Sequence, residues 1–144
     1  MAQGFKLVSD PGATVYRNFV ISSQAYTIGD AVDVSRTAAD VVPSTASSTT
    51  LGLKGVAMQT VTSAATVLLV CLVNSFQQWS ADTTNNSNSA HNYQRMILTD
   101  KATVNNTGTD STTSSGVVEQ QGIIGAVGDK RIVVRFVVSA NITA

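Results

Sequence analysis

Residues 116–138 read GVVEQQGIIGAVGDKRIVVRFVV and form the clearest hairpin pattern in the chain. Residues 117–127 and residues 131–138 are both rich in valine and isoleucine, and Gly128, Asp129 and Lys130 separate them. Two such runs joined by a short segment of turn-forming residues are typical of a β-hairpin. The stretch therefore predicts two antiparallel strands near the end of the chain.

Further strands are expected closer to the N-terminus. The sequence IGDAVDV at residues 28–34 combines a Gly-Asp turn with a short alternating strand, and residues 55–61 alternate in the same way. The apolar run TVLLVCLV at residues 66–73 predicts a central strand buried on both faces, and residues 94–104 predict another strand. No helical period of useful length is present, so we expect an all-β domain, a small barrel or sandwich of about six or seven strands.

The first 23 residues differ from the rest, because polar residues and a turn separate their few apolar side chains. We expect an extended N-terminal arm over residues 1–23 and a single β domain over residues 24–144. Such an arm either covers its own domain or lies along a neighbouring molecule, and one sequence does not choose between these arrangements. Tyr16, Arg17 and Phe19 are its candidate partner contacts, since aromatic residues and arginine dominate interface energetics. For the aromatic pair, the alternative is core packing within a first strand.

Composition narrows the class of protein. The chain has 144 residues, of which 12% are charged, and its formal net charge is zero. Soluble domains usually carry about 25% charged residues. Binding to nucleic acid or to an anionic membrane requires clustered Lys and Arg, so we expect neither partner. The N-terminal residues lack a signal-peptide pattern, which predicts synthesis and folding in a cytoplasm.

Residues that perform chemistry are scarce. His91 is the only histidine and falls in a polar loop, while Cys71 is the only cysteine and falls in the most apolar run. One histidine and one buried thiol cannot supply a zinc site or a catalytic triad, so we expect no metal, no cofactor and no enzymatic activity. Most aspartates occupy turn positions, where they bond their own backbone, and Gly122, Gly125 and Gly128 are expected in turns or bulges. A hydrolase that uses paired aspartates is the third-ranked alternative.

Arg131 and Arg135 lie on one face of the last predicted strand, about 13 Å apart at strand spacing. That spacing suits two separate acidic contacts on a partner. The competing interpretation is a solvated face, or an edge strand protected by charge.

The order of these segments resembles the small β-barrel capsid decoration, or cement, proteins of tailed bacteriophages. The resemblance covers residues 26–138 and rests on the GDAV turn, the GVA strand start and the closing GIIGAVGD and VVRF segments. It implies a virion protein on the outside of an icosahedral head, which clamps adjacent major capsid protein subunits and often forms homotrimers. The long Asn/Ser/Thr loops and the arm depart from the family pattern.

The second hypothesis is a carbohydrate-binding or adhesion module of a phage tail or fibre. Trp79 and Tyr93 flank a polar loop and could form an aromatic platform for a glycan. The alternative for Trp79 is burial beside a strand end.

Overall fold

The computed structural model describes residues 3–10, 14–34, 40–49, 53–107, 116–126 and 128–137. Over these residues the prediction of an all-β fold is confirmed, because they contain no α-helix and only a single 3₁₀ turn, η1 (Ser89–His91). Eleven strands are described: β1 (Lys6–Ser9), β2 (Val15–Val20), β3 (Ala31–Val34), β4 (Val41–Pro43), β5 (Leu53–Ala57), β6 (Val67–Leu72), β7 (Gln78–Thr83), β8 (Arg95–Asp100), β9 (Thr103–Asn105), β10 (Val118–Ile123) and β11 (Arg131–Phe136).

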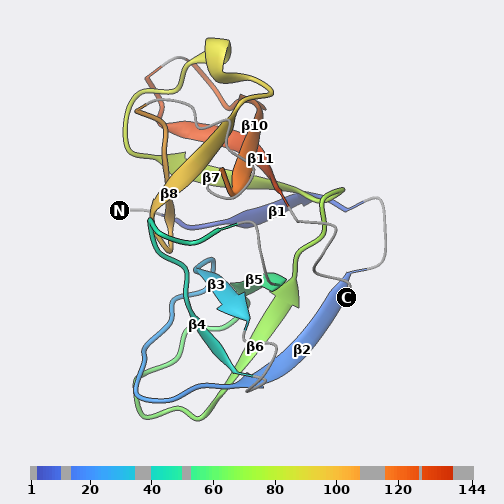
Figure 1. Cartoon of the computed structure of the whole chain (residues 1–144), viewed down its shortest axis with the longest axis vertical. Helices are drawn as coiled ribbons and strands as arrows, with labels where there is room; N and C mark the ends of the chain where they lie inside the picture. Colours follow the sequence, from blue (N-terminus) through green and yellow to red (C-terminus); the bar gives the residue numbers. More distant parts are fainter. Residues whose placement is uncertain are drawn as a thin grey trace.

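The strands form two five-stranded units that follow one another along the chain and lie at opposite ends of the molecule (Figure 1). The first unit is a curled sheet with the order β2-β6-β5-β3-β4, and a parallel bridge between Val20 and Asp40 brings its two outer strands together. The second unit has the order β7-β11-β10-β8-β9, and a parallel pairing of β7 with β9 closes it into a barrel. β1 is an additional strand, antiparallel to β7.

The two units have the same topology. In each one, the first strand pairs with the fifth and the fifth with the fourth, the fourth pairs with the second, and the second pairs with the third. The strand directions agree, and the residues that pair in the first unit have counterparts 62–64 positions later in the second. Matched pairs are Val20–Asp40 with Asp82–Thr103, Val34–Val41 with Leu98–Val104, and Phe19–Leu68 with Ala81–Ile132. The chain is therefore a tandem structural repeat, which no sequence pattern predicted.

Matched side chains also fill the interiors of both units. The interior positions on the strands of the first unit correspond to buried residues on the strands of the second, and most of these residues are aliphatic. The interior residues are Phe19, Val32, Val34, Val41, Ala57, Leu68 and Val70 in the first unit, and Ala81, Met96, Leu98, Val104, Gln120, Ile132 and Val134 in the second. The repeat therefore extends from the backbone ladders to the packing.

A second apolar layer joins the two units. Phe136 packs against Phe5 with ring centroids 5.0 Å apart, and against Trp79 in an edge-to-face arrangement at 6.2 Å. Val56 and Cys71 of the first unit belong to the same buried cluster. The units therefore form one domain around a shared core.

A polar contact also connects the units. The side chain of Lys101, in the turn between β8 and β9, forms an ion pair of 3.3 Å with Asp30 of the first unit. The carbonyl of Lys101 accepts a hydrogen bond of 2.6 Å from the backbone N–H of Ala31. Both contacts place the β8–β9 turn against the start of β3.

The closing hairpin is confirmed with shorter strands than predicted. β10 and β11 pair antiparallel, and the register shifts between Gln120 and Gly122, where a bulge interrupts the ladder. Gly125 and Gly128 have positive φ angles in the connection, as expected of turn glycines. Val127 lies outside the described residues.

The prediction for residues 66–73 is partly wrong. β6 does lie inside its sheet, between β2 and β5. Both faces are buried over its second half, where Val70 packs inside the first unit and Cys71 belongs to the shared core, whereas Val67 is exposed and Leu69 is half-buried. Burial on both sides therefore holds at Val70 and Cys71 and fails at Val67 and Leu69.

Truncating equivalent interior side chains tests whether the two units unfold together. We expect Leu68→Ala and Ile132→Ala each to lower the free energy of unfolding by about 2–5 kcal/mol, because both leave a cavity in a small core. Urea denaturation followed by circular dichroism and by Trp79 fluorescence should give one coincident transition for each variant.

Val67→Ala is the matched control, since Val67 is exposed beside Leu68. We expect Val67→Ala to lower the free energy of unfolding by less than about 1 kcal/mol. Two separable transitions, each sensitive to only one of the core substitutions, would show that the units are independent domains.

Candidate interaction surface

The segment predicted as an arm lies along its own domain. β1 pairs with β7, and β2 pairs with β6 over six consecutive residues. Phe5 and Ile21 belong to the buried cores. Of the two arrangements that the sequence left open, the structure therefore has the one in which residues of this segment cover their own domain, and these residues account for two of the strands beyond the predicted number.

The alternation of β2 separates its two predicted aromatic contacts. Phe19 is only 7% exposed and packs inside the first unit, so core packing is correct for this residue. Tyr16 is 51% exposed and lies on the opposite face of the strand. Arg17 is also exposed, and within the part of the chain that the structure describes no acidic side chain pairs with it.

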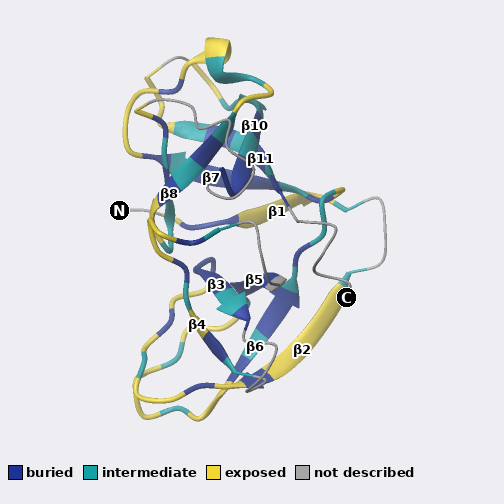
Figure 2. Ribbon diagram, in the orientation of Figure 1, coloured by how far each residue is buried: buried dark blue, intermediate teal, exposed yellow. Residues whose placement is uncertain are grey.

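An exposed surface surrounds Tyr16. Cross-strand pairing places Asn18 beside Leu69 and Val20 beside Val67, on the same outer side as Tyr16. Val20 and Val67 are about half exposed or more, and Figure 2 shows β2 as the longest exposed strand of its unit. We call Tyr16, Asn18, Val20, Val67 and Leu69 the β2 face. Sequence reasoning missed its valines because apolar strand residues were assumed to point inward.

Arg131 and Arg135 lie on β11, which is an inner strand between β7 and β10, so the edge-strand interpretation is wrong. Arg131 forms an ion pair with Asp82 and donates a hydrogen bond of 2.8 Å to the hydroxyl of Ser80. Arg135 binds both carboxylate oxygens of Glu119, at 3.0 and 3.1 Å. Both guanidinium groups are satisfied within the chain, so a partner's acid would have to share or displace these carboxylates.

The aromatic platform of the adhesion hypothesis is absent. Trp79 is 1% exposed and packs against Phe136, as the burial alternative predicted. Tyr93 is well exposed, but it has no exposed tryptophan beside it. A flat pair of aromatic rings is therefore not available to a sugar at this position.

Titratable groups form no obvious chemical centre in the described part of the chain. No cluster of three or more His, Cys, Asp and Glu side chains there could hold a metal ion. Asp10, Asp30, Asp110 and Asp129 are among the aspartates expected at turn positions. Asp30 and Asp129 each accept a backbone hydrogen bond of 2.8 Å within a turn, and Asp110 lies outside the described residues. His91 belongs to η1 on the polar loop. None of the described helical segments is long and apolar enough to cross a membrane.

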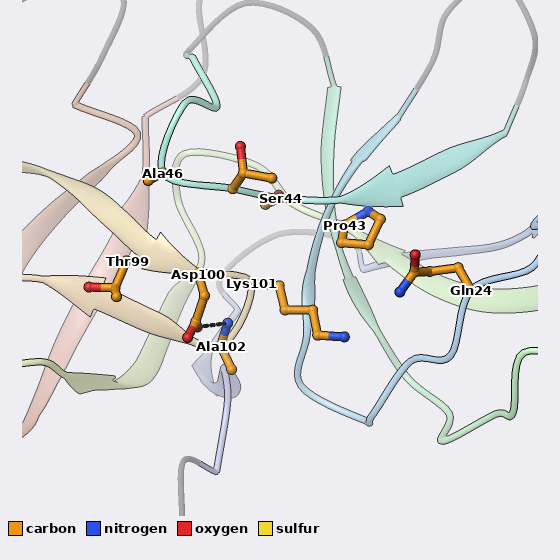
Figure 3. A pocket seen from close by; sticks show the side chains of 9 residues that line it. Gln24, Pro43, Ser44, Ala46, Thr99, Asp100, Lys101 and Ala102 are labelled. Carbon is orange, nitrogen blue, oxygen red and sulfur yellow. Dashed lines mark hydrogen bonds between the residues drawn. The ribbon is translucent and has the colours of Figure 1, made fainter.

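A cavity of about 530 Å³ opens between the two units (Figure 3). Residues 43–46, from the last residue of β4 onward, form one wall, and residues 99–102 around the β8–β9 turn form the other. Its charged groups already have partners: Lys101 binds Asp30, and Asp100 accepts a hydrogen bond of 2.8 Å from the N–H of Ala102. The cavity therefore offers no set of unpaired polar groups that converge on a ligand.

No protein-family model and no curated protein sequence matches this chain. The resemblance to capsid decoration proteins therefore depends on the order of the sequence segments alone. Geometrically, the candidate site is the β2 face together with Arg17, which is exposed but which strand alternation places on the other side of β2, the side of Phe19.

Substituting Glu119 tests the ion pair with Arg135. Burial alone would raise the pKa of Glu119, but hydrogen bonds from Arg135 and Gln121 and the charges of Arg135 and Arg95 outweigh it, so the pKa lies below its usual value. We expect Glu119→Gln to lower the free energy of unfolding by about 1–2 kcal/mol at neutral pH.

Because the folded-state pKa is depressed, this contribution is fully present above the ordinary glutamate pKa. It is lost as the pH falls through the lower pKa of the folded state. Urea titrations of the unmodified protein and of Glu119→Gln across the acidic range should show that the difference between their free energies of unfolding shrinks as the pH falls. A difference that is the same at every pH would contradict the assigned ion pair.

The thiol of Cys71 should be unreactive in the native protein. Its side chain is buried, and burial raises the pKa of the thiol, so little thiolate forms at neutral pH. Intact-mass measurement after iodoacetamide treatment should find native protein unmodified and urea-unfolded protein fully alkylated. Alkylation of the native protein at the rate of a free cysteine would show that the shared core opens readily.

Proposed function

We propose that this protein is a structural component of a virus particle, a decoration protein that binds the outer surface of an assembled tailed-phage capsid. In this role it stabilises the shell by clamping adjacent major capsid protein subunits. The observation that carries the proposal is the β2 face, an exposed and largely apolar strand surface on a small β domain of zero net charge. The resemblance in the order of segments supports the same role.

The physical mechanism follows from linkage. A protein that binds assembled shell subunits but not free ones lowers the free energy of the assembled state in proportion to its occupancy. If copies act as a homotrimer, several weak contacts combine through a high effective concentration, so each surface can be small. A short apolar strand that carries an exposed arginine suits such a contact.

Within the proposed contact, Tyr16 is the aromatic anchor and Arg17 supplies charge. Phe19 acts indirectly, since its side chain holds β2 against the interior of the first unit. Arg131 and Arg135 take second place, because Asp82 and Glu119 already neutralise them.

Copy number in purified particles tests the proposal most directly. We expect quantitative mass spectrometry of virions from the source to find hundreds of copies of this protein per particle, comparable with the major capsid protein. A handful of copies would indicate a tail or fibre component, and absence from the particle would refute a virion role.

Binding of variants to particles stripped of this protein then tests the surface. Tyr16→Ala should weaken binding about tenfold or more, as expected for an interface aromatic. Tyr93→Ala removes a tyrosine that is more exposed than Tyr16 and lies far from β2 in the chain, and this variant should bind as the unmodified protein does. Equal loss in both variants would remove the β2 face from the contact.

A further inference from the structure

The repeat reveals a difference between the two units at one strand edge. In the second unit, two strands pair with the outer edge of β7: β1 pairs with residues 78–80, and β9 pairs with Asp82 and Thr83. In the first unit, the counterpart of β7 is β2. The bridge from Val20 to Asp40 corresponds to the β9 pairing, but among the described residues no strand corresponds to β1.

The backbone direction of β2 shows which groups are left unpaired. The N–H of Ile21 donates to the carbonyl of Thr66 across the β2–β6 ladder, at 3.0 Å. Bonding alternates along an antiparallel ladder, so Phe19 and Arg17 also bond toward β6, whereas the N–H and C=O groups of Tyr16 and Asn18 point away from it. These two residues are the counterparts of Gln78 and Ser80, which pair with β1.

We propose that the open edge of β2, at residues 16–18, is a docking site for an extended segment of a partner protein, which adds to the sheet as an antiparallel strand. β1 on β7 is the intramolecular example of this geometry: Lys6 lies opposite Ser80 and Leu7 opposite Trp79. Four backbone groups, two donors and two acceptors, have no partner among the described residues and can form the ladder. Strand addition of this kind supplies affinity through main-chain bonds and specificity through the flanking side chains.

Charge identifies the side chain expected in the partner. Arg17 occupies the position that corresponds to Trp79, so the incoming residue opposite it corresponds to Leu7. Arg17 is exposed and has no acidic partner among the described residues. An Asp or Glu in that position of the partner forms a favourable cross-strand pair. Next to it, an apolar residue would cover Tyr16.

The same charge disfavours a second copy as the occupant. Antiparallel pairing of two β2 edges that uses both free residues places Tyr16 opposite Asn18, and therefore Arg17 opposite Arg17. Like charges directly opposite each other destabilise a strand pair. The partner is therefore a different, acidic segment. Its assignment to a capsid subunit rests on the proposed function, whereas the docking site itself does not.

Peptides with the sequence of β1 and its flanking residues test the site without any virus particle. The probe is residues 3–10 as a blocked peptide carrying Leu7→Glu, and its matched control carries Leu7→Lys. Both are titrated to millimolar concentration into the ¹⁵N-labelled full chain. We expect the Glu peptide to shift the amide signals of Tyr16 and Asn18 and to bind at least five times more tightly than the Lys peptide. N-methylation of the Lys6 nitrogen in the Glu peptide should abolish binding, because it removes a ladder donor.

Variants of the protein separate charge from backbone pairing. Arg17→Glu should reverse the preference, so that the Lys peptide binds more tightly, whereas Lys130→Glu makes the same charge change on an exposed turn and should leave the preference unaltered. Asn18→Pro removes an outward N–H that the β2–β6 ladder does not use, and it should block both peptides. Unfolding curves establish that each variant is folded.

Three results would overturn the proposal. The first is that no peptide perturbs the amide signals of Tyr16 and Asn18. The second is that the Glu and Lys peptides bind equally tightly. The third is that the unmodified protein self-associates and that Asn18→Pro abolishes this self-association. The last result would assign the edge to a second copy. Peptide binding at β2 combined with absence of the protein from virions would retain the docking site and refute the capsid role.

Discussion

An apolar layer, in which Phe5, Trp79 and Phe136 meet the outer side of the first unit, holds the two units together. Each five-stranded unit encloses only a small set of interior side chains, and units of about 60 residues bury too little surface to be more than marginally stable. The shared layer supplies a second core that belongs to neither unit alone. Because Phe5 contributes to this shared layer, the N-terminal segment is part of the domain. The packing of Phe5 also holds β1, which follows it in the chain, beside β7.

The two units differ in the polarity of the side chains at some matching positions. In the first, Lys54 is buried and forms an ion pair of 3.1 Å with Asp33, whose carboxylate also accepts hydrogen bonds from Ser44 and Ser48. The residues at matching positions of the second unit are Ile97 and Val117, which are apolar. A buried pair is often replaceable by well-packed hydrophobic residues at little cost in stability. The two units therefore share their backbone pairing but differ in the polarity of the side chains at these positions.

Much of the fold was predictable from local patterns. The closing hairpin, the Gly29–Asp30 turn and the burial of Trp79 all follow from residue types over a few positions. Two features could not be predicted, because they depend on pairing between distant segments. β1 finds its partner in β7, and the repeat is visible in registers whereas matched residues such as Phe19 and Ala81 share only burial. For the candidate site, the sequence singled out Tyr16 and Arg17 but not their place on a strand edge that no described strand pairs at residues 16–18, since such an edge is defined by a missing neighbour.

The separation of β1 from β7 also orders events during synthesis. β1 and β2 emerge first, and Ser80, which pairs with Lys6, is made only after the whole first unit. At about 5–20 residues per second, this interval lasts several seconds. During this interval the edge of β2 is the nearest strand edge to β1, because only a few residues separate the two strands. The matched geometry of the two units makes this edge suitable for pairing with β1. On the ribosome we expect β1 to shield β2 as a transient hairpin and to move to β7 once that strand exists. In that sequence of events β1 covers the edge of β2 during synthesis, and its move to β7 uncovers this edge.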